Sequence, residues 1–347
     1  MTIIFILFCI VCLYNAKFCS DNSEYLSRKN TQIINGIFAF LIFLSHFVSY
    51  LEPNIPLSSF YLDVRSFLKQ LVVVTFLFYS GYGMFESFKK KGSTYIQSIP
   101  NRFLKLLFRF DLAILLFLVL AIILKEPLTI KRVFFSFLAW QGLGNSYWYV
   151  FIVLCLYVIM YFVFKIFHGK IPLSLMMFTL GALILSFAFI YIEKPAAWYN
   201  TIFSFVAGMW FSYYKDKFES FINRSTFCYG ISLGCIFSTF IVLHSYMDDS
   251  LFIYELVEIL FCILIVLLSK KVILNNPLLK WLGNHVFSFY ILQRIPMIVG
   301  DKLGMNRNFI IYFLMCLVSS VLLSHYFDLL TSKLEKYIFS FERKKLQ

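Results

Sequence analysis

The sequence has little charge for its length and no long hydrophilic stretch. Only 14% of its 347 residues are Asp, Glu, Lys or Arg, whereas 61% are hydrophobic and the mean hydropathy is +0.80. Soluble globular domains carry about 25% charged residues, so this composition excludes a water-soluble fold. Because no soluble catalytic module is visible either, any chemistry must use residues of the membrane domain.

The chain also lacks the common signatures of cofactor, metal and disulfide sites. It contains no Walker loop, dinucleotide fingerprint or nucleophile elbow. Seven of the eight cysteines fall in apolar runs, and Cys9-Ile-Val-Cys12 has no histidine or carboxylate beside it, which favours packing over redox chemistry or zinc. No metal-ligand spacing is found among His168, His244, His285 and His325. We therefore expect no metal and no bound cofactor.

Apolar runs of about 20 residues, each able to cross roughly 30 Å of hydrocarbon as a helix, recur along the whole chain. They predict an all-α, polytopic membrane bundle of about eleven transmembrane helices. The expected spans are residues 2–19, 31–50, 67–87, 105–124, 147–167, 172–192, 198–214, 226–244, 251–269, 284–299 and 308–328. We find no internal repeat, so the spans form one integral domain.

The first span has three possible fates. It could be a signal sequence, lie flat on the membrane or cross it, and the lack of a basic n-region and of a clear small-residue cleavage site favours an uncleaved helix. We divide the chain into an N-terminal helix with its linker (1–30), a main transmembrane domain (31–330) and a basic tail (331–347).

The basic residues predict the orientation. The net charge is +13, but the cations lie in short loops and form no basic domain, so we expect no nucleic-acid partner. One side of the membrane collects 21 of the 31 Lys and Arg residues, against eight on the other. The 21 lie in loops 15–31, 88–105, 165–171, 215–225, 270–283 and the tail 329–347. By the positive-inside rule this side, with the C-terminus, is cytoplasmic, which predicts a multi-pass protein of the cell inner (plasma) membrane.

His46 is the most informative single residue, because it lies in the apolar stretch 37–48. An ionisable side chain inside a membrane predicts a functional site, and imidazole suits proton transfer near neutral pH. Asn35 lies eleven residues earlier, on nearly the same helix face and about 16 Å along the axis. The alternative is a histidine that simply hydrogen-bonds a neighbouring helix.

Two further features follow along the chain. Ser80, Gly81 and Gly83 interrupt a bulky helix, where small residues permit either close helix packing or a narrow path for an extended acyl carrier. Arg102 and Lys105 share a helix face, with Ser98 as the expected N-cap, which predicts a phosphate site at a helix N-terminus. Ordinary positive-inside anchoring and contact with anionic lipid remain alternatives for these cations.

In this order, Asn35-(ten residues)-His46, Ser80-Gly81-Tyr82 and Arg102-Phe-Leu-Lys105 resemble the membrane-bound acyltransferase family 3, whose members often acylate sugars of surface glycans. Segments 147–149, 205–208 and 281–290 are also similar to that family, so the likeness covers about residues 30–300. The family core has ten spans. The resemblance therefore implies an acyltransferase-like domain at 31–330, with span 2–19 as an addition.

The resemblance implies an O-acyltransferase that moves an acyl group, with acetyl expected, from cytosolic acyl-CoA to a hydroxyl of a cell-surface or lipid-linked glycan. O-acetylation of a polysaccharide would be its outcome. His46 would act as general base. Ser80, Gly81 and Tyr82 would line the acyl path, and Arg102 and Lys105 would hold the donor phosphates. Asn35 would also belong to this binding site for acyl-CoA. The lipid bilayer and a glycan or glycolipid acceptor are the expected partners, and acyl-CoA is a substrate rather than a cofactor.

Asn35 departs from the family pattern, which has Arg or Lys at this position. The departure could weaken activity, transfer the charge to another cation such as Arg109, or alter the donor. Glu255 and Glu258 share a helix face and could contact a sugar or a proton, or form an interfacial ion pair.

The main alternative function is a transporter or flippase for a lipid-linked saccharide, with the intramembrane His, Arg and Glu residues as a polar pathway. No inverted repeat or pair of broken helices supports it. A glycan polymerase, the third possibility, would need a large outer loop that the sequence lacks.

Overall fold

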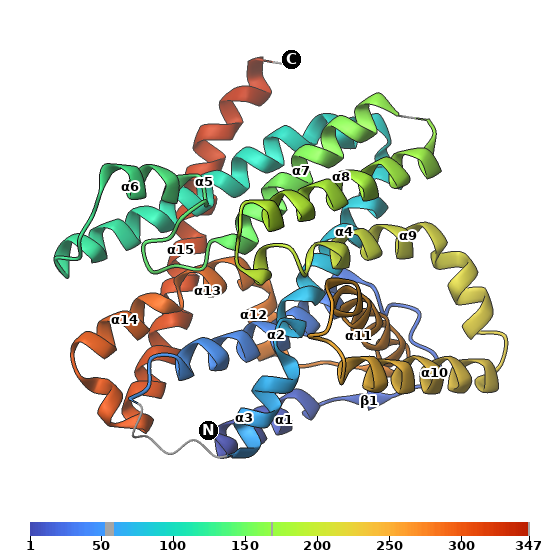
Figure 1. The fold of residues 1–347 in the computed structure, drawn as a ribbon, viewed down its shortest axis with the longest axis horizontal. Coiled ribbons are helices and arrows are strands. Elements are labelled where there is room, and N and C mark those ends of the chain that lie inside the picture. The colour runs from blue at the N-terminus through green and yellow to red at the C-terminus, as the bar shows by residue number, and fades with distance from the viewer. Residues whose placement is uncertain (53–58, 168, 346–347) are drawn as a thin grey trace.

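The computed structural model describes residues 1–52, 59–167 and 169–345 and is a helical bundle, which confirms the all-α, polytopic membrane architecture (Figure 1). Eight helical segments of this described part are long and apolar enough to cross a membrane. They are α2 (Arg28–Val48), α3 with α4 (Ser59–Leu68 and Leu71–Lys91), α5 (Ser93–Ile123), α7 (Trp148–Ile166), α8 (Ile171–Tyr191), α10 (Thr226–His244), α11 (Leu251–Lys271) and α15 (Phe309–Lys345).

The expected span 2–19 takes a different form. Helix α1 (Thr2–Leu13) has 12 residues, or about 18 Å at 1.5 Å per residue, which is too short to cross the hydrocarbon. The chain turns at Asn15, whose φ is 60°, and continues into strand β1 (Lys17–Phe18). This strand pairs antiparallel with β2 (Val272–Ile273), directly after α11.

Two more expected spans differ from the prediction. The run 198–214 becomes a 3-10 turn (Ala196–Trp198) and α9 (Ile202–Ile222), whose second half carries charged residues from Lys215 to Glu219. The run 284–299 is divided into α12 (Pro277–Asn284), α13 (Val286–Leu292) and α14 (Arg294–Lys302). Pro296 explains the second division, because it has no N–H for the carbonyl of Leu292 and its ring crowds that carbonyl.

Two pairs of glycines hold the central helices together. A Cβ on Gly36 of α2 would lie 2.0 Å from the carbonyl oxygen of Leu279 in α12, and one on Gly283 would lie 1.7 Å from that of Gln32. Helices α4 and α9 cross in the same way, with Gly81 against Phe205 and Gly208 against Phe78. Backbones approach this closely only where no side chain intervenes, so these glycines fix both crossings.

Helix α5 begins earlier than the sequence predicts. It starts at Ser93 after Gly92, and Pro100 lies inside the helix. Ser98 is therefore not an N-cap, and its hydroxyl instead donates to the carbonyl of Tyr95 at 2.7 Å. The expected helix N-terminus beside Arg102 is wrong, because the helix extends through this stretch from the preceding turn.

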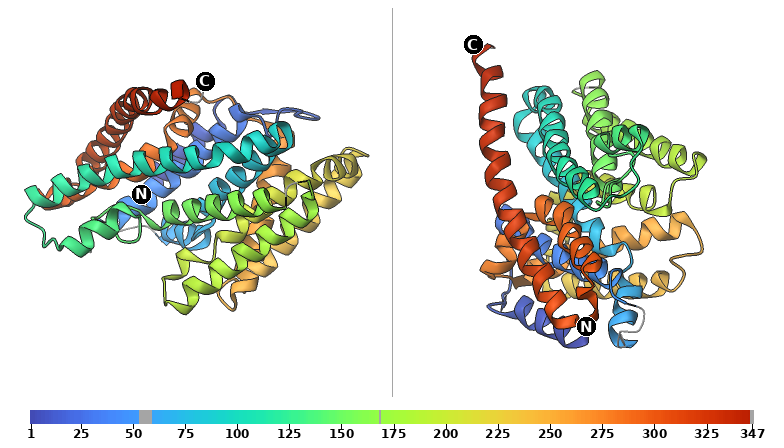
Figure 2. Two further views of the ribbon diagram at one scale, coloured as in Figure 1. Left: turned by 90° about the horizontal axis from the view of Figure 1, so that it is seen from above. Right: turned by 90° about the vertical axis from the view of Figure 1, so that its left-hand side faces the viewer.

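The remaining elements are the short helix α6 (Ile130–Phe137) and a 3-10 turn (Met305–Arg307) before α15. Helix α15 continues from its expected span into residues predicted to be a tail, and its C-terminal part extends beyond the other helices (Figure 2).

Candidate active site

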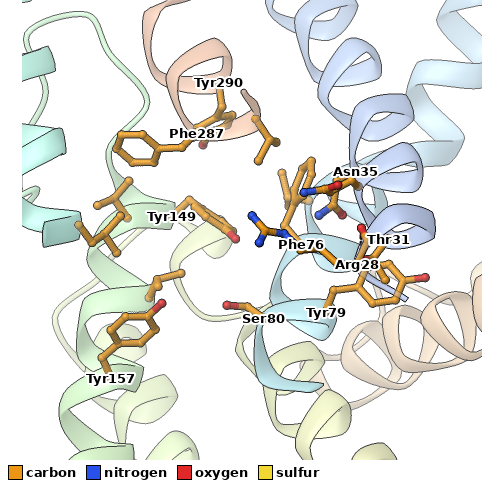
Figure 3. Close-up of a pocket in the computed structure, with 16 residues that line it drawn as sticks. Arg28, Thr31, Asn35, Phe76, Tyr79, Ser80, Tyr149, Tyr157, Phe287 and Tyr290 are labelled. Atoms are coloured by element: carbon orange, nitrogen blue, oxygen red, sulfur yellow. Dashed lines mark hydrogen bonds between the residues drawn. The ribbon is translucent and has the colours of Figure 1, made fainter. Parts of the chain in front are cut away.

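A cavity of about 450 Å³ lies inside the bundle, bounded by α2, α4, α7 and α13 and by Leu106 of α5 (Figure 3). This volume is within the range of small-molecule sites. Aliphatic and aromatic side chains form much of its wall. Its polar lining residues are Arg28, Thr31, Gln32, Asn35, Tyr79, Ser80, Tyr149, Tyr157 and Tyr290.

The first two turns of α2 supply one polar face of the cavity. Arg28, Thr31, Gln32 and Asn35 follow the three- and four-residue spacing that puts side chains on one side of a helix. Asn35 Oδ1 is buried and has no hydrogen-bond partner among the described residues. Because an unpaired buried polar atom costs about 1–3 kcal/mol, this carboxamide is poised for a ligand that can donate a hydrogen bond.

Arg28 is the charged residue that lines the cavity, although hydropathy predicts only a loop at this position. Figure 3 shows its guanidinium pointing into the cavity, on the side facing Tyr149. Its position two helical turns before Asn35, on the same face, is the sequence signal that could have identified it.

Tyrosines form the opposite wall. Tyr149 and Tyr157 come from α7 and Tyr290 from α13, and the rings of Tyr149 and Tyr290 have centroids 5.7 Å apart at 64°. Tyr79 of α4 has a buried hydroxyl without a partner in the described part of the chain. The cavity thus joins an apolar interior with several polar groups that can bind a ligand.

His46 lies next to this cavity but does not line it. Its Nδ1 is 3.1 Å from Nε2 of Gln293, a fully buried side chain that also donates to the carbonyl of Tyr290 at 3.2 Å. A carbonyl can only accept, so Nε2 is the amide nitrogen, and Nδ1 of a neutral His46 accepts its second hydrogen. This is the contact with a neighbouring helix that the alternative interpretation expected, and the catalytic role stays a prediction.

Ser80 is brought to Asn35, whereas its two neighbours face elsewhere. Gly81 packs against the backbone of Phe205, and the ring of Tyr82 lies 6.0 Å from that of Phe211 in α9. Of the predicted acyl-path residues, only Ser80 lines this cavity.

Arg102 and Lys105 also lie outside the cavity. The Arg102 guanidinium is 4.9 Å from the centre of the Tyr95 ring, and Lys105 Nζ is 5.4 Å from that of Phe339. Their predicted binding of donor phosphates stays a prediction. Arg109 forms an ion pair with Glu335, including a hydrogen bond of 3.0 Å, and so does not stand beside Asn35.

Comparisons with known proteins identify the family. A family model described as an acyltransferase domain matches residues 32–328, which is most of the chain. The chain belongs to acyltransferase family 3. Neither the curated proteins nor the solved structures compared with it gave a match.

The family domain begins in the middle of the cavity's polar face. Gln32 and Asn35 lie within the matched residues, as do the cavity residues of α4, α7 and α13, whereas Arg28 and Thr31 precede them. Helix α1 is likewise outside the match.

A second polar group of the acyltransferase domain lies where α12 meets α13. His285 Nδ1 is 2.5 Å from Oδ2 of Asp328, which also accepts a hydrogen bond from Ser288 Oγ at 2.8 Å. The hydroxyl therefore points to the carboxylate rather than to the imidazole, and this group is not a nucleophile and base pair. The sequence gives no signal for this group, because His285 and Asp328 lie 43 residues apart.

Glu255 and Glu258 are buried against the first turn of α9. Glu255 accepts from the N–H of Phe203 at 3.2 Å and Glu258 from the hydroxyl of Ser204 at 3.4 Å. Neither forms an ion pair with a described residue, so the expected interfacial ion pair is not found. Because the two carboxylates lie at the N-terminus of α9, the positive end of its helix dipole partly offsets the cost of burying them.

Within residues 1–52, 59–167 and 169–345, no three His, Cys, Asp or Glu side chains are grouped so that they could hold a metal ion. His168 lies outside the described residues.

Proposed function

We propose that this membrane-bound acyltransferase moves an acyl group, with acetyl expected, from cytosolic acyl-CoA to a hydroxyl of a cell-surface or lipid-linked glycan. The cavity carries the proposal, because all its lining residues except Arg28 and Thr31 belong to the acyltransferase domain and because it joins an apolar interior to hydrogen-bonding groups. An acyl chain suits the apolar walls, and a hydroxylated acceptor suits the tyrosines and the carboxamide of Asn35.

In the proposed reaction, the acceptor hydroxyl oxygen attacks the carbonyl carbon of the thioester. A C–O bond forms, the C–S bond breaks, and the sulfur leaves as the thiol of coenzyme A after taking up a proton. A base must remove the hydroxyl proton, and we assign this role to His46. Its neighbour Tyr290, with ring centroids 6.3 Å apart, connects His46 to the cavity lining.

Gln293 bears on how His46 would accept that proton. In the arrangement described, Nδ1 accepts a hydrogen bond, so Nε2 of the neutral ring carries the proton. We propose that the Gln293 amide turns away from His46 during the reaction. This movement would break its hydrogen bonds to His46 and to the carbonyl of Tyr290. Nδ1, the nitrogen without a proton, would then be free to take the proton of the acceptor hydroxyl.

The donor side is proposed from the charge distribution. Ser80 supports the acyl path directly, and Gly81 and Tyr82 support it through the packing of α4 on α9. Arg102 and Lys105 would meet the donor outside the cavity. We place their side and the C-terminus in the cytoplasm, in a multi-pass protein of the inner (plasma) membrane, because the basic loops collect there.

Mass analysis of surface glycans tests the function. Cells with the protein should carry acetyl groups on a glycan repeat, and cells without it should lose a mass equal to one acetyl per repeat. Identical glycans in both would contradict the proposal. The transporter alternative has no observation in its favour, since the family match is to an acyltransferase domain.

A further inference from the structure

The cavity contains one cation and no anion. Arg28 is the charged residue among those that line it, and within the described part of the chain its side chain forms no ion pair or hydrogen bond. Figure 3 shows the guanidinium inside the cavity rather than turned away from it. Arg28 is an exposed residue at the open edge of the cavity. There it can meet a ligand that brings negative charge, and guanidinium is well suited to bind phosphate through two parallel hydrogen bonds.

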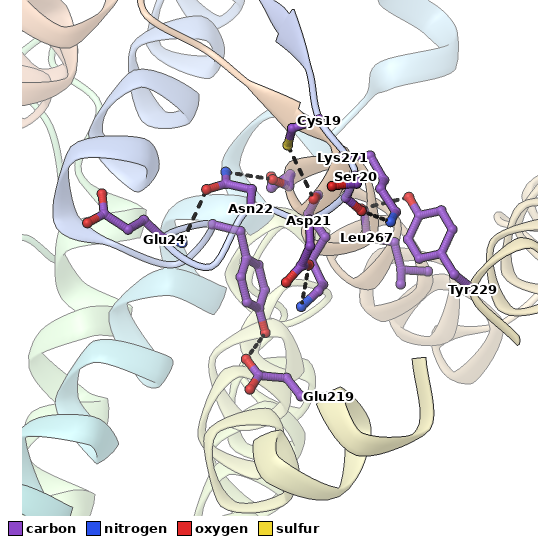
Figure 4. Close-up of polar contacts among 12 residues, drawn as sticks. Cys19, Ser20, Asp21, Asn22, Glu24, Glu219, Tyr229, Leu267 and Lys271 are labelled. Atoms are coloured by element: carbon purple, nitrogen blue, oxygen red, sulfur yellow. Dashed lines mark hydrogen bonds and ion pairs between the residues drawn. The ribbon is translucent and has the colours of Figure 1, made fainter. Parts of the chain in front are cut away.

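The linker before α2 fixes the position of Arg28. Tyr25, almost fully buried, donates its hydroxyl hydrogen to Glu219 of α9 at 2.7 Å, and Asn22 donates to the carbonyl of Ser269 at 3.0 Å (Figure 4). Asp21 pairs with Lys270 at 3.1 Å. Because α2 begins three residues after Tyr25, its first side chain starts from a firmly held backbone.

Three cations of α5 contact partners outside the cavity. Arg109 is paired with Glu335, Arg102 lies over Tyr95, and Lys105 lies near Phe339. The binding of an anion inside the cavity therefore falls to Arg28. Thr31, Gln32 and Asn35 on the same face add hydrogen-bonding groups.

The position of Arg28 in the membrane indicates that the anion belongs to the acyl donor. Helices α2 and α4 are consecutive membrane crossings, so the start of α2 lies at the same end as the basic end of α4, Lys89 to Lys91. This is the end that we place in the cytoplasm, where acyl-CoA is found.

We propose that Arg28 binds a phosphate of the acyl-CoA donor and so supplies, two turns away, the positive charge that Asn35 lacks. This inference rests on the proposed function. Phosphate could also come from a lipid-linked acceptor, and the experiment separates the two sources.

The test compares the purified full chain with the variants Arg28→Gln, Arg28→Lys and Lys29→Gln. Lys29 is exposed, as Arg28 is, but it does not line the cavity, so its variant is the matched control. Initial rates are measured with acetyl-CoA and with S-acetyl-pantetheine, which lacks all phosphates. We expect Arg28→Gln to raise the KM for acetyl-CoA about tenfold or more, as loss of a charge-assisted hydrogen bond implies.

The other arms have definite outcomes. Arg28→Lys should recover much of the loss, Lys29→Gln should change the KM less than about twofold, and the effect of Arg28→Gln should vanish with S-acetyl-pantetheine. A KM within about twofold of wild type in Arg28→Gln, the same loss with both donors, or a change confined to the acceptor KM would each overturn the assignment.

Binding separates this inference from the proposed function. Coenzyme A should raise the Tm of the wild-type protein more than pantetheine does, and Arg28→Gln should erase that difference. Equal Tm shifts in wild type and Arg28→Gln contradict the role of Arg28. Absence of acyl transfer by the wild-type protein would instead contradict the proposed function. The Tm comparison would still show whether Arg28 binds the phosphates of coenzyme A.

Discussion

His46 and Asn35 share a face of α2 but meet different surroundings. Asn35 lines the cavity and its Oδ1 has no hydrogen-bond partner in the described residues. His46 does not line the cavity: it is hydrogen-bonded to Gln293 and lies next to the lining residue Tyr290. The amide of Gln293 determines which nitrogen of His46 carries the proton, so its effect on catalysis should be separable from substrate binding.

Replacement of Gln293 by leucine tests this positioning role. Gln293→Leu keeps the side-chain size but removes the hydrogen bond to His46, and we expect kcat to fall about tenfold, because a buried hydrogen bond contributes about 1 kcal/mol or more. The KM for acyl-CoA should change less than about twofold, since Gln293 does not line the cavity.

The informative result is which of the two constants, kcat or KM, changes in Gln293→Leu. A raised KM with unchanged kcat would show that Gln293 acts on the shape of the cavity instead of on His46. Size-exclusion profiles of the detergent-solubilised variant report whether it remains folded.

The site could be predicted only in part from sequence. Asn35 and Ser80 are brought together at the cavity, in keeping with their order in the family pattern. Arg28 was missed because hydropathy assigned it to a loop, whereas the Ser27 cap starts α2 there. The pairing of Arg109 with Glu335, 226 residues away, depends on tertiary contacts that no local pattern contains.

At the scale of helices, glycine explains why Ser80 faces the cavity. Gly81 fits against Phe205 and Gly208 against Phe78, and this crossing sets the rotation of α4. The sequence of this segment is compatible with either close packing or a ligand path. In the structure Gly81 packs against α9, whereas Ser80 lines the cavity.

Gly81→Ala should destabilise the protein, because the added Cβ would lie 2.1 Å from the carbonyl oxygen of Phe205. Overpacking of this kind costs about 1–3 kcal/mol and should lower the Tm by several degrees. Gly83→Ala is the matched control on the same helix, with nothing within 4 Å of its Cβ. It should keep or raise the Tm, since alanine favours helix over glycine by about 1 kcal/mol. Equal Tm values for both variants would contradict the role of the α4 and α9 crossing.

The helix boundaries show where hydropathy succeeds and where it does not. Long apolar runs such as 226–244 coincide with α10. The run 2–19 was too long because hydropathy does not register the turn at Asn15 or the pairing of β1 with β2. The run 284–299 contains Pro296, which interrupts a helix because it lacks a backbone N–H. Hydropathy does not detect this effect, because proline is not a strongly polar residue.

At the scale of the whole molecule, the chain is a membrane bundle of acyltransferase family 3 with a cavity between its helices. Arg28 at the start of α2 and His46 near its end would, in the proposed mechanism, mark the donor end and the base end of the reaction path. Asn35 and His46 are eleven helical steps apart, about 16 Å. In the proposed mechanism, the extended arm of acyl-CoA spans this distance.

The most direct measurement is the transfer of labelled acetyl from acetyl-CoA to the surface glycan by membranes containing wild type, His46→Ala or His244→Ala. His244 is the matched control, because its ring stacks on Phe67 outside the cavity. Loss of a general base costs about 10²- to 10⁴-fold, so His46→Ala should lose at least about a hundredfold in rate while His244→Ala stays close to wild type. A rate in His46→Ala equal to wild type, with both proteins inserted at the same level, would contradict the proposed through-membrane acyl transfer.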